Sequence, residues 1–100
     1  MIVVRVSWQL DSNRIYHLFI LEKNKQGIKL LGIGETSDAY NAATPDPSAE
    51  QAKKAINDAL KEANLQPKDI DYINLHGTGT IANDLMEAKA INEIFGENTP

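Results

Sequence analysis

Apolar and polar residues alternate weakly along the first part of the chain. Between residues 1 and 8 every second side chain is apolar, which is typical of a strand with one exposed face. Two further β-branched and aromatic runs, 15–21 and 28–33, predict a second and a third strand. Within the third run, Gly32 and Gly34 indicate a bulge or the close approach of another backbone.

Two helices are predicted in the second half of the chain. The first begins at Ser48, which forms a capping-box pattern with Gln51, and ends at Asn64. Its apolar positions repeat at helical spacing and are Ala52, Ala55, Ile56, Ala59, Leu60 and Ala63. The second helix is expected over 83–95, with Gly96 after its last turn.

The segments between these elements complete an α/β pattern. Residues 70–75 are apolar on both faces, as in a buried strand of an α/β sheet. Residues 35–47 are rich in Asp, Asn, Thr and Pro, and a loop of that length in a compact domain is usually functional or disordered. We therefore expect one small α/β domain.

Composition narrows the possible functions. The 100 residues are 42% apolar and 24% charged, as in an ordinary globular domain. The net charge of −4 argues against nonspecific nucleic-acid binding, which needs a basic face. No apolar run approaches the roughly 18–20 residues of a membrane span, and no signal-peptide pattern is present, so we expect a cytoplasmic protein without membrane contact. The chain has no cysteine, which excludes disulfides, thiolate metal sites and a cysteine nucleophile within it.

The candidate chemistry lies in one short stretch. His76 follows the run 70–75, where open α/β sheets bind ligands beyond the carboxyl ends of their strands. A neutral imidazole there can donate a hydrogen bond to a developing oxyanion or accept a proton. The glycines at 77 and 79 allow close backbone approach, and Thr78 and Thr80 offer hydroxyls. The alternative is a structural histidine followed by a tight turn with a threonine N-cap.

Two acids follow on the second helix. Helical spacing puts Asp84 and Glu87 on the apolar face with Ala88, Ile91 and Phe95, towards the interior or a cleft near His76. They could be partners of the helix dipole, metal ligands with His76, or neighbours of a buried cation. The metal interpretation is the weakest, because the spacing matches no recognised metal motif.

The run 70–80 and the residues after it carry a resemblance to a known family. The stretch from Ile70 to Thr80, including His76-Gly77-Thr78-Gly79-Thr80, resembles the C-terminal half of the β-ketoacyl-acyl carrier protein synthases. Further residues agree, namely 18–22, 32–34, 37–40, Pro45, 83–84, Glu87, 90–91 and 95–96. The resemblance covers 15–96. Residues 1–14 match nothing in it, and 97–100 are expected to be a frayed or truncated end.

This resemblance implies a fold and an activity. The fold is a partial thiolase-like one, a mixed sheet with helices that forms part of the second βαβαβ half. The activity is a decarboxylative Claisen condensation in fatty acid or polyketide synthesis, in which His76 hydrogen-bonds the thioester carbonyl of malonyl-acyl carrier protein. Thr78, Thr80 and, approximately, Thr44 correspond to contacts of the phosphopantetheine tunnel. Glu87 and Asp84 correspond to supporting acids, Glu87 near an essential lysine.

The same resemblance implies partners and an incomplete site. The partners are acyl carrier protein and either a second copy or the remainder of the ketosynthase. No metal or other cofactor is implied, because phosphopantetheine carries the substrate. The nucleophilic cysteine is absent, and the family's lysine and second histidine would follow Pro100. We therefore expect the chain to be inactive alone. The alternatives are a non-catalytic carrier-protein or pantetheine binding module and an inert self-associating fragment.

Overall fold

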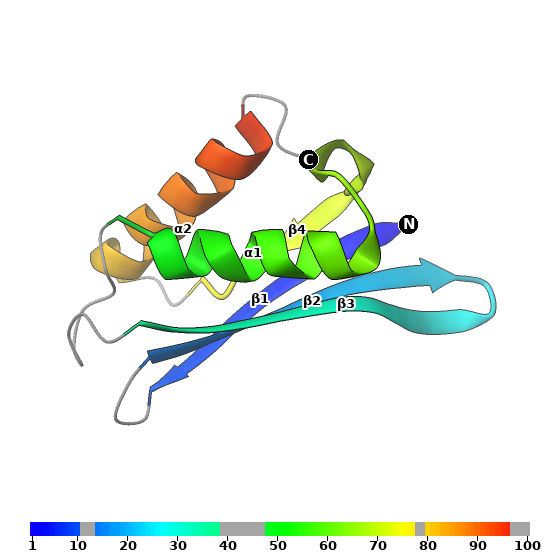
Figure 1. The fold of residues 1–100 in the computed structure, drawn as a ribbon, viewed down its shortest axis with the longest axis horizontal. Coiled ribbons are helices and arrows are strands. Elements are labelled where there is room, and N and C mark those ends of the chain that lie inside the picture. The colour runs from blue at the N-terminus through cyan, green and yellow to red at the C-terminus, as the bar shows by residue number, and fades with distance from the viewer. Residues whose placement is uncertain (11–13, 39–47, 78–79, 97–100) are drawn as a thin grey trace.

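The computed structural model describes residues 1–10, 14–38, 48–77 and 80–96 (Figure 1). Of the irregular loop expected over 35–47, residues 39–47 lie outside the described residues, and 35–38 are extended instead, as the end of a strand. The elements in chain order are β1 (Ile2–Leu10), β2 (Arg14–Asn24), β3 (Gly27–Asp38), α1 (Glu50–Ala63), the 3-10 turn η1 (Pro67–Asp69), β4 (Tyr72–Asn74) and α2 (Ile81–Phe95).

The four strands form one mixed sheet in the order β3-β2-β1-β4. β1 pairs antiparallel with β2 and parallel with β4, and β2 pairs antiparallel with β3. Both α1 and α2 lie on the same side of this sheet (Figure 1). The α/β class is confirmed, and the arrangement leaves the other side of the sheet without a helix among the described residues.

The alternation in the first two strands places the core on the helical side. Val4, Leu18 and Ile20 are at most 1% exposed, whereas Arg5 points to solvent. In β3 the pairing skips Leu31, because Ile20 faces Gly32 and the next residue, Leu21, faces Leu30. This irregularity confirms the bulge expected near the two glycines.

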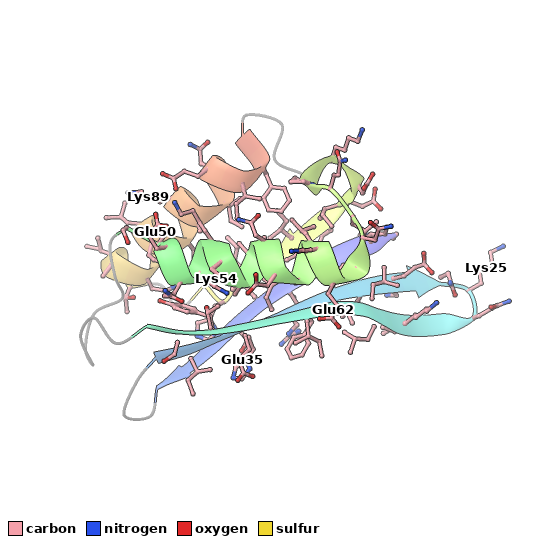
Figure 2. The ribbon with its side chains drawn as sticks, in the orientation of Figure 1. Lys25, Glu35, Glu50, Lys54, Glu62 and Lys89 are labelled. Atoms are coloured by element: carbon pink, nitrogen blue, oxygen red, sulfur yellow. The ribbon has the colours of Figure 1, made fainter. Side chains whose placement is uncertain are left out.

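α1 packs almost backbone to backbone on β3. A Cβ atom at Gly34 would lie 1.9 Å from the carbonyl oxygen of Ala55, and one at Gly32 would lie 2.4 Å from that of Ala59. Where the helix meets the two glycines its own residues are the small Ala55 and Ala59, which allows this approach. At the edge of the contact, Glu62 Oε2 accepts a hydrogen bond from the backbone N–H of Ile33 at 3.4 Å (Figure 2).

The ends of α1 match the sequence analysis only in part. The helix ends as expected, with Asn64 in the left-handed region at φ 57°. The predicted capping box is wrong, because Ala49 occupies the N-cap at φ 60° and no side chain caps the helix there. Ser48 therefore lies one residue before the N-cap position. The Oγ atom of Ser48 accepts a 3.4 Å hydrogen bond from the N–H of Glu50.

The run 70–75 is not the buried strand that was expected. Only Tyr72–Asn74 is extended, and it lies at the edge of the described sheet, beside β1 alone. Tyr72 is consequently 52% exposed, whereas Ile73 is half-buried towards the helices. Sequence patterns distinguish strand from loop, but a central strand and an edge strand of this length differ mainly in their neighbours.

Candidate functional site

The site is built on the turn that joins β4 to α2. His76 is half-buried at the start of this turn, and Gly77 adopts φ +59°, a conformation that glycine takes without strain. Thr80 ends the turn as the N-cap of α2, where its Oγ1 accepts a 3.4 Å hydrogen bond from the N–H of Asn83. The threonine N-cap considered in the sequence analysis is thus present.

A buried carboxylate holds the turn against α2. Glu87 is 4% exposed, and its Oε2 accepts a 2.9 Å hydrogen bond from the backbone N–H of His76. Its Oε1 accepts a second 2.9 Å bond from the N–H of Gly77. Because an isolated buried carboxylate is strongly destabilising, these donors account for the acid on an otherwise apolar face. Glu87 therefore fixes the two peptide groups on either side of the His76 Cα atom.

Asn83 completes this arrangement, although the sequence assigned it only to the family resemblance and not to the site. Its side chain is 1% exposed, and Nδ2 donates to Glu87 Oε1 at 2.6 Å. Asn83 and Glu87 are four residues apart, so they are neighbours on one helix face. That spacing was the available signal, but a neutral amide stands out less from a sequence than the two acids beside it.

The predicted orientation of α2 is wrong by about one residue. Its buried positions are Asn83, Met86, Glu87, Ala90 and Ile91. Asp84 and Ala88, assigned to that face, are exposed, while Phe95 is half-buried. Met86 and Ala90 are each 2% exposed, and the helix is rotated to bury them together with Glu87. Asp84 stays in the first turn, where an acid favours the helix dipole, and does not share the environment of Glu87.

A small apolar cavity lies beneath the turn. Leu75, Met86 and Glu87 contribute to its wall, and the rest comes from His17 and from core residues of the sheet, of α1 and of α2. The carboxylate of Glu87 accordingly lies between the turn and the hydrophobic core.

Two of the expected contact residues lie outside the described residues, and the chain's second histidine lies on the sheet. The two contact residues are Thr78 and Thr44. His17 lies on β2, where its Nδ1 is 3.2 Å from Glu35 Oε2 on β3, and Glu35 points away from the helices (Figure 2). Among the residues that the structure describes, no three His, Asp or Glu side chains gather as metal ligands. In that same part of the chain, no helix has the length and apolar character needed to cross a membrane.

An ion pair between the helices changes the pKa values of its members. Lys53 Nζ lies 2.8 Å from Glu50 Oε1 and 2.5 Å from Glu93 Oε2 of α2. The hydrogen bonds that Lys53 donates to Glu50 and, second, to Glu93 raise the pKa of Lys53, and the bond accepted from Lys53 lowers the pKa of Glu93. Solvent-exposed Lys54 and Lys89 carry further charge near this junction (Figure 2).

Comparison with known proteins identifies the group to which these features belong. Residues 28–100 match the family described as the C-terminal domain of beta-ketoacyl synthases. The chain is 44% identical over 69 residues to 3-oxoacyl-[acyl-carrier-protein] synthase 2 of Staphylococcus aureus, and 44% identical over 72 residues to the protein of that name in Mycobacterium bovis. These matches cover 69% and 72% of the chain and 17% of each relative.

The fold agrees with a solved structure. A chain from the complex of a ketosynthase with its chain length factor, from Xenorhabdus doucetiae, superposes with a TM-score of 0.71 and 54% sequence identity. The superposition covers 83% of this chain and 21% of that one. The thiolase-like fold and the resemblance are confirmed, and the chain spans about a fifth or less of the proteins it matches. The chain belongs to the β-ketoacyl synthase family, of which it represents part of the C-terminal half.

Proposed function

We propose that this chain is a piece of a 3-oxoacyl-acyl carrier protein synthase that decarboxylates malonyl-carrier protein and condenses the product with an acyl chain. In this proposal His76 is the catalytic donor to the malonyl thioester carbonyl. The observation that carries it is the fixed turn, in which Glu87 holds the N–H groups of His76 and Gly77 at 2.9 Å. The names of its relatives give the reaction class.

The chemistry requires a fixed donor at that position. Loss of carbon dioxide breaks a carbon–carbon bond and places its electron pair in an enolate, whose negative charge resides largely on the thioester oxygen. A preorganised hydrogen-bond donor in a site shielded from water stabilises that charge. The enolate carbon then attacks the carbonyl carbon of the acyl thioester, and the thiolate that held the acyl chain leaves. Such a thiolate belongs to a nucleophile like cysteine, which must come from outside this chain.

The remaining assignments complete the proposed site. Thr80 is exposed at the end of the turn. We assign it, with Thr78 and Thr44, to contacts with the phosphopantetheine arm of acyl carrier protein. Glu87 is the supporting acid. Asp84 supports the site only through the first turn of α2, because it is exposed there. The partners are acyl carrier protein and the remainder of a ketosynthase, or a second copy.

A chimera tests the catalytic assignment. The chain's matched residues replace the corresponding segment of the 44% identical Staphylococcus aureus synthase, and consumption of malonyl-carrier protein is measured. We expect the chimera to condense, and His76→Ala to lower kcat by about 100- to 1,000-fold, the usual effect of removing an oxyanion donor. A folded chimera whose His76→Ala variant keeps its rate would contradict the proposal. Asn57→Ala, an exposed residue of α1, is the matched control.

The chain by itself is proposed to be inactive, and its bare sheet face favours a second candidate. Ile33 and Tyr72 are 40% and 52% exposed in the described sheet, which suits an inert fragment that associates with itself. Sedimentation of the 100-residue chain, with and without phosphopantetheinylated carrier protein, separates the cases. Carrier binding without turnover would indicate a binding module. Concentration-dependent association without carrier binding would indicate the inert fragment.

A further inference from the structure

The most deeply buried polar side chain in the described residues is an amide at the start of α2. Asn83 is 1% exposed, one turn before Glu87 on the same face. A buried amide is destabilising unless it is hydrogen-bonded, so its contacts determine why it is tolerated. Its Nδ2 donates to Glu87 Oε1 at 2.6 Å, a short bond from a neutral donor to an acid.

This bond restrains the terminal torsion of the Glu87 side chain. Torsions at the end of a glutamate side chain are broad, so burial alone does not fix the plane of the carboxylate. Oε2 accepts from the N–H of His76, and Oε1 accepts from both Gly77 and Asn83. The third donor comes from the helix rather than the turn. It therefore defines the carboxylate plane independently of the peptide that the carboxylate holds.

We propose that Asn83 is a positioning residue for His76, acting through the carboxylate of Glu87. The geometry is a relay of three parts: the Asn83 amide orients Glu87, Glu87 holds the N–H groups of His76 and Gly77, and the two peptide groups that carry them flank the Cα atom from which the imidazole extends. The inference rests on the proposed role of His76 in catalysis. The structural part of the relay can be measured without any catalytic assay.

Amide hydrogen exchange on the 100-residue chain tests the relay directly. Removing the donor with Asn83→Ala should speed exchange of the His76 and Gly77 amides by about tenfold, the size expected for a weakened hydrogen bond to a charged acceptor. The N–H of Leu18 in the central sheet reports global unfolding. Its exchange should change less than that of the two turn amides. Asn92→Ala, an exposed residue of the same helix, should leave all three unchanged.

A second variant separates donation from packing. Asn83→Asp keeps the shape of the side chain but opposes Glu87 with an acceptor, so it should speed exchange of the turn amides at least as much as Asn83→Ala. If only packing mattered, Asn83→Asp would leave them protected. Unchanged turn amides in both variants, or equal acceleration at Leu18, would overturn the proposal.

The chimera provides the catalytic readout. Because a positioning residue affects the transition state rather than carrier binding, Asn83→Ala should lower kcat by about tenfold with KM nearly constant. An increase in KM at constant kcat would overturn the relay. Failure of His76→Ala to slow the chimera would refute only the catalytic role of His76, and the exchange result would then still decide whether Asn83 orients the turn.

Discussion

The α1–β3 contact and the α2–turn contact are held together in different ways. The first is apolar and close, with Gly32 and Gly34 meeting the backbone of α1 at Ala59 and Ala55. The second is polar, with one buried carboxylate accepting three hydrogen bonds around His76. The apolar contact makes the scaffold, whereas the polar contact defines the conformation of the proposed catalytic residue.

The two contacts should therefore respond differently to substitution. Steric contact between backbones tolerates no added atom, because interiors are close-packed and neither element can move alone. A polar cluster tolerates changes of size better than changes of donor and acceptor pattern. Each substitution below alters one of these properties.

The largest effect is expected at Gly34. In Gly34→Ala the new Cβ would lie 1.9 Å from the carbonyl oxygen of Ala55, so α1 must move off the sheet, at about 3 kcal/mol or more. Gly32→Ala, with a nearest atom at 2.4 Å, should cost less. Urea unfolding measures both. The control is Ser37→Ala, an exposed residue of β3, which should change the free energy of unfolding by no more than about 0.5 kcal/mol. If Gly34→Ala and Gly32→Ala were as stable as Ser37→Ala, the close contact between α1 and β3 would be refuted.

A smaller loss is expected from Glu87→Gln. The amide keeps the size of the side chain but turns an NH₂ group towards a backbone N–H, leaving one buried donor without an acceptor, at about 2 kcal/mol. Asp84→Asn is the contrast, because Asp84 is exposed and contributes only to the helix dipole. Urea unfolding of both variants compares the two acids. If Asp84→Asn costs as much as Glu87→Gln, the observed rotation of α2 is incorrect.

Much of the apolar contact was predictable from the sequence. The alternation in 1–8 and the helical spacing of the apolar positions of α1 both reflect burial, which follows a period of two residues in a strand and about 3.6 residues in a helix. Gly32 and Gly34 were informative because a glycine within a strand commonly marks a bulge or a closely approaching backbone, and both occur here. The N-cap of α1 was not predictable, because the left-handed conformation of Ala49 is unfavourable for that residue in isolation.

The polar contact was only half predictable. Glu87 stood out as an acid on an apolar face near His76, but its hydrogen-bond donors depend on a turn whose backbone no periodicity describes. The face of α2 was misjudged because Ala88 and Ala90 are equally apolar, and only packing selects between them. The edge position of β4 depends on which strands pair, which is a property of the whole sheet.

Thr80 connects the turn to α2, and its loss should have a moderate effect. Thr80→Ala removes the acceptor for the Asn83 N–H, at about 1 kcal/mol or somewhat less because the bond is 3.4 Å long. Thr80→Ser keeps the hydroxyl and should restore most of the stability. Thermal unfolding followed by circular dichroism measures both. A serine variant as unstable as the alanine variant would mean that the methyl group, rather than the cap, matters.

The smallest effect is expected at the ion pair that joins the helices outside both contacts. Lys53 and Glu93 are partly solvent-exposed, so salt screens their attraction. The pKa of Lys53 is raised, so its contribution is complete below the ordinary value of 10.5 and is lost as the pH rises through the folded pKa. The pKa of Glu93 is lowered, so its contribution is present above the ordinary value of 4.5 and is lost as the pH falls through the folded pKa.

The stability difference between the parent chain and Lys53→Met should therefore have a plateau between these limits and shrink in high salt. A difference that is independent of both pH and salt would mean that the lysine stem packs against α2, making this junction an apolar contact like that of α1 with β3.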